Sequence, residues 1–253
     1  MKITLVGTGT SGGVPSLGCH CRVCSSNDPH DHRLRCAALL ETDTTRILID
    51  SGPDIRQQLM PFPFSRIDGV LLTHGHYDHV GGLDDLRPFS VFGSVDVFAD
   101  ATTCKRVHEQ MPYCFGANLY PGVLLINLHE IKAHVPLRIG DVDIMPVQVM
   151  HDRLPILGYR FGKFAYITDM KTIADEEYGY LEGIDTLVVN ALRMEKEHHS
   201  HQLVRDAIKF AHKIKAKRTF LIHCSHQIGL HEEVNAVLPS DVRLAYDGQV
   251  IYV

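Results

Sequence analysis

The sequence predicts an α/β domain in which β-sheets form the interior and helices cover the outside. Two observations support this fold class. Short apolar runs rich in β-branched residues recur along the whole 253-residue chain, and helix-like segments lie between them without any linker or low-complexity stretch. Such alternation favours a single domain, residues 1–253, with sheets inside and helices outside.

The predicted strands are apolar runs bounded by turn residues, and they are too short and too β-branched to be helices. They are 2–6, 46–50, 69–73, 95–98, 143–149, 157–161, 164–168, 186–190, 219–222 and 243–253. The last run contains Asp247-Gly248, a signal for a two-residue hairpin. The predicted helices between the strands are 54–60, 83–87, 101–110, 173–180 and 202–214.

Composition excludes several classes of protein. The net charge of −5 gives no overall basic field that would attract nucleic acid. No run reaches the roughly 18 apolar residues of a membrane span, and the apolar run before the first glycines is too short for a signal peptide. The seven cysteines are an odd number, which argues for free thiols or metal ligands in a reducing compartment. We therefore expect a cytoplasmic protein with no membrane partner.

The most informative segment is Thr73-His74-Gly75-His76-Tyr77-Asp78-His79, which follows an apolar run directly. Three imidazoles and a carboxylate packed together without a metal would desolvate at high cost. Around a divalent metal, the same groups are ordinary ligands. His74 and His76 are two residues apart and point the same way in an extended segment. The segment therefore predicts a metal site at the end of a strand.

This segment resembles the His-x-His-x-Asp-His signature of the metallo-β-lactamase superfamily, and the rest of that family's ligand series follows in order. The resemblance implies the four-layer αββα fold, with two facing mixed β-sheets and helices outside. It also implies a binuclear metal-dependent hydrolase. One metal would be held by His74, His76 and His151, the other by Asp78, His79 and His223, with Asp169 bridging both. Asp50 would orient a metal-binding loop without touching a metal.

A second cluster, Cys19-x-Cys21-x-x-Cys24, offers three thiolates within six residues. A structural zinc needs a fourth ligand, and His226, three residues beyond His223, is the favoured candidate over His20 and Cys224. The same cysteine spacing and histidine position hold a structural zinc in the branch resembling the cyclic phosphodiesterase of the carbon–phosphorus lyase pathway. A redox pair or free thiols remain the alternatives.

Gly7-x-Gly9-x-x-Gly12 formally satisfies a dinucleotide-binding fingerprint. That interpretation is rejected because Gly13-Val14-Pro15 continues as a loop where the fingerprint requires a helix. The glycines are instead expected to let the backbone turn closely beneath the metal site.

The family resemblance is strongest to phosphodiesterases, a group that includes the tRNA 3′-processing endonuclease. Two divalent ions, zinc or manganese with iron also compatible, would lower the pKa of a bridging water and neutralise charge on the substrate. Asp78 is a ligand at the reacting centre. His201 is the expected general acid that protonates the leaving alkoxide, with His198 in reserve.

The expected substrate is a small, possibly cyclic, phosphodiester. The endonuclease's basic RNA-gripping arm is missing, and the basic cluster of 209–218 is expected to be a solvated helix face. Nucleic acid is therefore not the expected partner, whereas a homodimer is compatible with the sequence. A thioester or acyl hydrolase and an RNA nuclease remain as alternatives.

Overall fold

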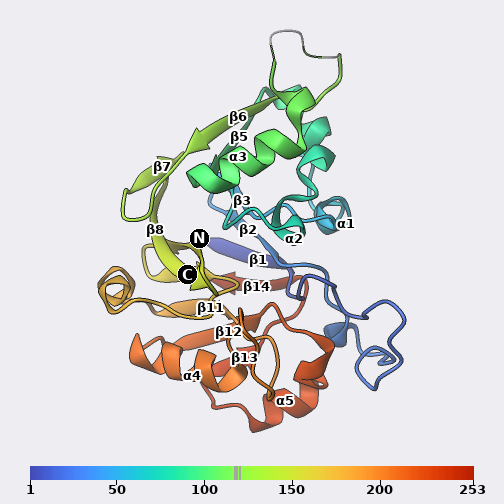
Figure 1. Cartoon of the computed structure of the whole chain (residues 1–253), viewed down its shortest axis with the longest axis vertical. Helices are drawn as coiled ribbons and strands as arrows, with labels where there is room; N and C mark the ends of the chain where they lie inside the picture. Colours follow the sequence, from blue (N-terminus) through green and yellow to red (C-terminus); the bar gives the residue numbers. More distant parts are fainter. Residues whose placement is uncertain (117–118, 120) are drawn as a thin grey trace.

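The computed structural model describes residues 1–253 except 117, 118 and 120. Two seven-stranded sheets lie face to face, with α1, α2 and α3 on the outer side of one and α4 and α5 beyond the other (Figure 1). This arrangement confirms the four-layer αββα fold. The helices are α1 (Ile55–Leu59), α2 (Tyr77–Val80), α3 (Ala101–Gln110), α4 (Val204–Lys213) and α5 (His231–Val237).

The first sheet has the strand order β14-β1-β2-β3-β4-β5-β6, and the second has the order β13-β12-β11-β10-β9-β8-β7. The strands of the first are β1 (Lys2–Gly7), β2 (Ala37–Glu41), β3 (Arg46–Ile49), β4 (Gly69–Leu71), β5 (Val95–Ala99), β6 (Ile126–Glu130) and β14 (Gln249–Tyr252). Those of the second are β7 (Leu137–Ile139), β8 (Val142–His151), β9 (Leu154–Phe161), β10 (Phe164–Ile167), β11 (Thr186–Asn190), β12 (Arg218–Ile222) and β13 (Val242–Leu244).

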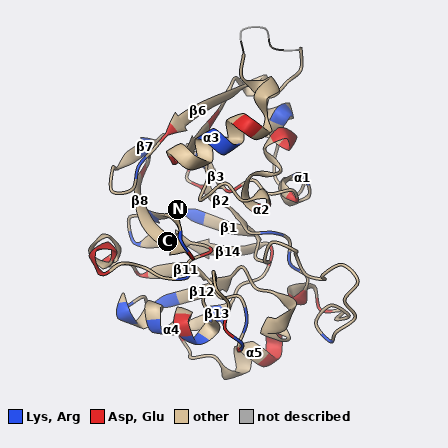
Figure 2. Ribbon diagram, in the orientation of Figure 1, with Lys and Arg blue, Asp and Glu red and all other residues tan. Residues whose placement is uncertain are grey.

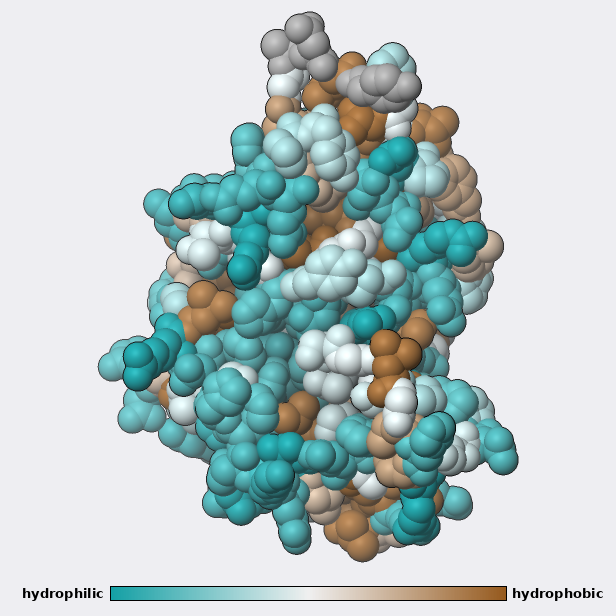
Figure 3. Space-filling model, turned by 45° about the vertical axis from the view of Figure 1, so that its right-hand side comes forward, coloured by the Kyte–Doolittle hydropathy of each residue, from teal (hydrophilic) through white to brown (hydrophobic). Residues whose placement is uncertain are grey.

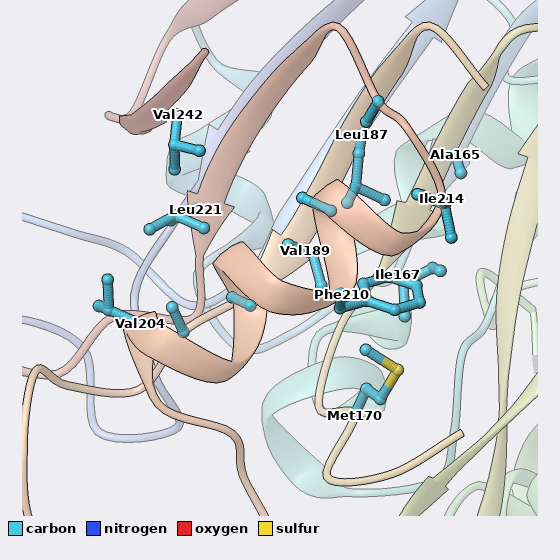
Figure 4. Close-up of a cluster of buried hydrophobic side chains, with 14 of the residues drawn as sticks. Ala165, Ile167, Met170, Leu187, Val189, Val204, Phe210, Ile214, Leu221 and Val242 are labelled. Atoms are coloured by element: carbon cyan, nitrogen blue, oxygen red, sulfur yellow. The ribbon is translucent and has the colours of Figure 1, made fainter. Parts of the chain in front are cut away.

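The three larger of the buried apolar clusters hold these layers together. One lies between the sheets, where Leu5 and Ile49 of the first sheet pack with Tyr159 and Tyr166 of the second. Another fills the space between the second sheet and α4, where Phe210 faces strand residues such as Ile167 and Val189 (Figure 4). The third lies beneath α1 and α3. On the face drawn in Figure 3, hydrophobic residues form separate patches among hydrophilic ones.

Strand direction explains why the candidate ligands can meet. In the first sheet β3, β4 and β5 run parallel, and in the second β10, β11 and β12 do so. The carboxyl ends of parallel strands lie at one edge of a sheet, and there the loops carry the chemistry. The segment 73–79 follows β4, Asp169 follows β10, His223 follows β12, and His151 ends β8.

Most predicted elements are present, and the differences have clear causes. The segments expected as helices at 83–87 and 173–180 are 3₁₀ helices, Leu83–Phe92 and Asp175–Leu181. The sequence analysis missed β2, β6, β7, α2 and α5. Strands β6 and β7 are edge elements with partly exposed residues, so they carry little of the apolar signal on which the prediction depends.

The hairpin predicted at Asp247-Gly248 was wrong. Strand β13 pairs with β12 in the second sheet, whereas β14 pairs with β1 in the first, so the segment passes from one sheet to the other. The Asp247 carboxylate accepts hydrogen bonds from the backbone N–H of Thr8 at 2.8 Å and of Leu34 at 2.6 Å. Asp247 and Gly248 do form a tight turn, closed by a hydrogen bond from the Gln249 N–H to the Tyr246 oxygen at 3.1 Å, but this turn connects strands of different sheets.

Candidate metal centre

The first group of candidate ligands consists of His74, His76 and His151, whose ligand atoms lie within 4.8 Å of one another. His74 Nε2 is 3.0 Å from His76 Nδ1. His151 Nδ1 points away from the group and lies 2.8 Å from the backbone oxygen of Asp169, to which it donates. Its remaining nitrogen is thereby left as an acceptor, which is the form that binds a metal.

The second group consists of Asp78, His79, Asp169 and His223, also with ligand atoms within 4.8 Å. Asp169 connects it with the first group. Its Oδ1 is 3.4 Å from His79 Nε2 and 3.1 Å from His223 Nε2, whereas its Oδ2 is 3.8 Å from His74 Nε2. The two oxygens of one carboxylate thus face the two groups, which is the arrangement expected of a bridging ligand.

Hydrogen bonding within the second group tests whether a cation fits there. The Nε2 atoms of His79 and His223 are buried and have no hydrogen-bond partner among the described residues. Buried polar atoms are rarely left unpaired. Imidazole and carboxylate donors that converge with unpaired nitrogens match the preferences of a divalent metal, so these residues fit the metals that the family implies.

The charges of the buried carboxylates and imidazoles also favour a bound cation. Burial opposes charge on both Asp169 and His79, but their mutual attraction outweighs it. The imidazoles of His223 and His79 hold the pKa of Asp169 well below its usual range, and the neighbouring carboxylates of Asp169, Asp50 and Asp78 raise that of His79. Burial, followed by the charge of His79, lowers the pKa of His74. The site therefore favours ionised carboxylates together with positive charge, which a dication supplies.

Asp50 supports this group from behind. It is fully buried, and its Oδ2 accepts a hydrogen bond from His79 Nδ1 at 2.7 Å. Its Oδ1 accepts another from the backbone N–H of Thr73 at 2.8 Å. Asp50 thus fixes the ring of His79 and the start of the segment 73–79, which is the orienting role expected of it.

The backbone carries a signal that the sequence analysis missed. Asp50, Asp169 and His223 have φ angles of 62°, 57° and 55°, in the left-handed region that non-glycine residues rarely adopt. Such strain clusters at functional sites, where the surrounding structure enforces it. Here it turns each side chain inward immediately after its strand ends.

His201 lies beside the candidate metal ligands. It is buried, its ring centroid is 4.7 Å from those of both His151 and His223, and its Nδ1 is 4.0 Å from Asp169 Oδ2. His201 even forms a third group of possible ligands with His151 and Asp169. Burial, followed by the charge of His223, lowers the pKa of His201 to about 3.

His198 lies at the outer side of His201, with 5.0 Å between the ring centroids. Burial, followed by the charge of His199, lowers the pKa of His198. His199 is exposed and packs on His198 at 4.5 Å. Of the three histidines in this loop, His201 is therefore the one that borders the metal ligands directly.

The four side chains proposed for the cysteine site also lie together. The ligand atoms of Cys19, Cys21, Cys24 and His226 lie within 4.8 Å of one another, and His226 Nδ1 is 3.3 Å from the sulfurs of both Cys19 and Cys21. The backbone N–H of Cys24, followed by His226, lowers the pKa of Cys21 to about 6, so Cys21 is a thiolate at neutral pH. Burial raises the pKa of Cys24 to about 11, so metal binding there would release its proton.

The two rival fourth ligands lie elsewhere. Cys224 is fully buried, its sulfur donates to the backbone oxygen of Leu221 at 3.7 Å, and burial raises its pKa to about 11. Neither Cys224 nor His20 belongs to the group found around the three thiols.

The glycine-rich segment after β1 forms no helix, in agreement with our rejection of a dinucleotide site. Gly9 instead forms bridges to Arg35 and Cys224. At Gly7 an added Cβ would lie 1.9 Å from the backbone oxygen of Arg35. The glycine thus permits two backbone segments to pack closely beside the loop that carries His223.

Two members of the basic cluster are paired with acidic neighbours. Lysines and arginines lie along α4 (Figure 2). Lys213 pairs with Asp175 at 3.1 Å, and Lys217 pairs with Asp185 at 2.9 Å. Among the described residues, no helix is both long and apolar enough to cross a membrane.

A family model described as "Beta-lactamase superfamily domain" matches residues 45–224. A solved structure titled as a new diphosphatase from the PhnP family has 38% sequence identity and a TM-score of 0.92, covering 99% of this chain and 96% of that one. Human tRNase Z, short form, has a TM-score of 0.73 and 21% identity, covering 100% of this chain and 99% of that one, which supports the fold alone.

A third relative is an octanoyltransferase of Porphyromonas gingivalis, 45% identical over 249 residues. The match covers 98% of this chain but 51% of that protein, so the chain spans about half the length of this curated relative. The name of that protein describes a polypeptide about twice as long.

Proposed function

The chain belongs to the beta-lactamase superfamily, and from this premise we propose that it is a binuclear phosphodiesterase acting on a small, possibly cyclic, phosphodiester. The superfamily and the buried histidine and aspartate groups support a metal-dependent hydrolase. The observation that carries the binuclear proposal is Asp169, whose two oxygens face the two groups of ligands. Chemistry at phosphorus is supported by the 38% identical relative, which is named a diphosphatase.

Two bound divalent cations would supply an activated water and neutralise charge on the phosphate. The residues of this chain would then fix the geometry and move a proton. His151 is oriented by hydrogen bonds to the backbone oxygens of Asp169 and Ser200, and His79 is oriented by Asp50. These contacts hold the donor atoms in place before any substrate arrives, which is how a preorganised site lowers a barrier.

His201 is the proposed general acid. In the free site its low pKa keeps the imidazole neutral, because burial disfavours the charged form. An anionic phosphodiester placed beside the ring would favour the imidazolium. The proton on His201 would then pass to the oxygen of the leaving alkoxide. His198, which packs on the outer side of His201, would limit the access of water to that ring.

The test compares two leaving groups. His201→Ala should slow hydrolysis of an alkyl phosphodiester about 10²- to 10⁴-fold, the usual contribution of general acid catalysis. The loss should be much smaller on a nitrophenyl ester, whose leaving group departs without a proton. His199→Ala serves as the matched control, because His199 is exposed. Equal losses on both substrates would show that His201 binds or positions the substrate instead of protonating the leaving group.

An acyl hydrolase is the second candidate, favoured by the octanoyltransferase relative. Octanoyl transfer, the activity for which that relative is named, can equally belong to the half of its chain that has no counterpart here. A panel of phosphodiester and thioester substrates with defined metals separates the two candidates. A nuclease acting on RNA would instead show RNA binding that weakens steeply with salt.

A further inference from the structure

An arginine connects the middle of the loop that carries His198 and His201 to the cysteine cluster. Arg193 is half-buried and its guanidinium donates three hydrogen bonds. Nε donates to the backbone oxygen of Lys196 at 2.8 Å, and Nη2 donates to that of Glu197 at 3.1 Å. Nη1 donates to Gln227 Oε1 at 2.5 Å. A planar guanidinium is suited to such a fork, which a lysine cannot reproduce.

The far end of this contact belongs to the cysteine cluster. Gln227 directly follows His226, which lies 3.3 Å from the sulfurs of Cys19 and Cys21. Both residues are in the short 3₁₀ helix His226–Ile228. The helix is capped by Ser225, whose hydroxyl accepts from the backbone N–H of Gln227 and donates to the backbone oxygen of Leu192. Ser225 and Arg193 thus join the helix to the beginning of the histidine loop.

The near end of the contact shapes the loop itself. Lys196 has a φ of 66°, a left-handed conformation that costs energy in a residue with a side chain. Arg193 holds the carbonyls of Lys196 and of the residue after it, so the arginine stabilises this turn. His198 follows immediately. Residues 195, 196, 197 and 199 are exposed. Apart from the ion pairs of the Glu197 side chain with Lys171 and Arg205, few contacts would hold this part of the loop without the arginine.

The other end of the loop has separate restraints. His151 Nδ1 lies 3.1 Å from the backbone oxygen of Ser200, and Lys171 Nζ donates to that of His201 at 3.3 Å. Residues of the second sheet therefore hold the backbone that places His201. What Arg193 sets is the middle of the loop and hence the packing of His198 against the ring of His201.

We propose that Arg193 is a positioning residue that couples the cysteine cluster to the histidine loop. Occupation of the cysteines and His226 by a metal fixes Gln227, Gln227 fixes the guanidinium, and the guanidinium fixes the turn that places His198 on His201. The effect on catalysis rests on the proposed function, whereas the coupling between the two segments does not.

The first test measures the coupling without any substrate. In the metal-loaded protein, hydrogen exchange of the buried Ser200 amide, which donates to His198 Nδ1 at 3.3 Å, should be at least about tenfold faster in Arg193→Met than in the unchanged protein. Cys21→Ser should produce a similar increase, and the double variant should show no further increase. Arg205→Met is the matched control, because Arg205 reaches the side chain of Glu197 but no loop carbonyl. Unchanged exchange in Arg193→Met, or additive effects in the double variant, would overturn the proposal.

The second test measures the consequence. Arg193→Met and Gln227→Leu should each lower kcat on an alkyl phosphodiester about 10- to 100-fold, the scale of a misplacement near 1 Å, with KM and active-site metal content nearly unchanged. The two substitutions should be non-additive, because they remove the two sides of one hydrogen bond. Retention of the exchange result without activity on any phosphodiester would contradict the proposed function and leave the coupling intact. Full activity in both variants would overturn the positioning role.

Discussion

Replacing Asp50 by asparagine tests whether its buried carboxylate determines how tightly a metal binds to the second group of ligands. Asparagine tolerates the left-handed backbone that Asp50 adopts at φ 62°, so the change alters chemistry without adding strain. One side-chain oxygen can still accept from the backbone N–H of Thr73. The other oxygen becomes an NH₂ group and meets His79 Nδ1, which donates at 2.7 Å in the native site.

Two donors cannot face each other at that distance. His79 must either turn its ring or move its proton to Nε2, and both changes remove Nε2 as a metal ligand. Loss of such an orienting partner typically weakens metal affinity 10- to 100-fold. That range corresponds to about 1.4–2.8 kcal/mol of binding free energy. We therefore expect Asp50→Asn to lose one of the two active-site metals first, as the metal concentration is lowered.

The assay is competition for zinc or manganese against a chromophoric chelator. Asp54→Asn is the control, because Asp54 is a neighbouring carboxylate that pairs with Arg35 at 2.8 Å and lies outside the ligand groups. Circular dichroism would verify that both variants are folded. An Asp50→Asn protein with unchanged affinity for both metals would refute the tautomer argument, and an equal loss in Asp54→Asn would refute its specificity.

Three further predictions concern metal content and stability. Elemental analysis of the zinc-loaded protein should give two ions that are lost in Asp169→Ala and one further ion that this variant keeps. A smaller number of ions in the unchanged protein would count against the binuclear site. Cys21→Ser should lower Tm by at least about 2–4 °C while the active-site metals remain, because metal binding at thiolates contributes to folding; an unchanged Tm with unchanged zinc would contradict this. Burial raises the pKa of Asp247 to about 6 from 3.8. The folded state therefore binds the carboxyl proton of Asp247 more tightly than the unfolded state does. The free energy of unfolding, relative to that of Asp247→Asn, should fall by roughly 2–3 kcal/mol as the pH rises from 4 to 7. Chemical denaturation of both proteins at each pH measures this difference, and a difference that does not change with pH would contradict the raised pKa of Asp247.

The sequence carried most of the information about the ligands because metal chemistry restricts residue types strongly. The segment 73–79 is difficult to explain without a metal, and the thiol spacing of 19–24 is equally restrictive. Buried strands such as 46–50 and 186–190 were also predictable, because continuous β-branched runs leave few alternatives. The weakly patterned edge strands β6 and β7 were missed for the opposite reason.

The sequence by itself determined which residues can bind metals and which layers the chain forms. Only the tertiary structure decided how those residues meet. The two oxygens of Asp169 face different groups of ligands. Burial lowers the pKa of His201 to about 3. The segment 243–253 contributes strands to two different sheets. Each outcome depends on distances and burial among segments far apart in the chain. Local sequence patterns do not specify such distances. Charge interactions and desolvation depend on the packed surroundings of each group.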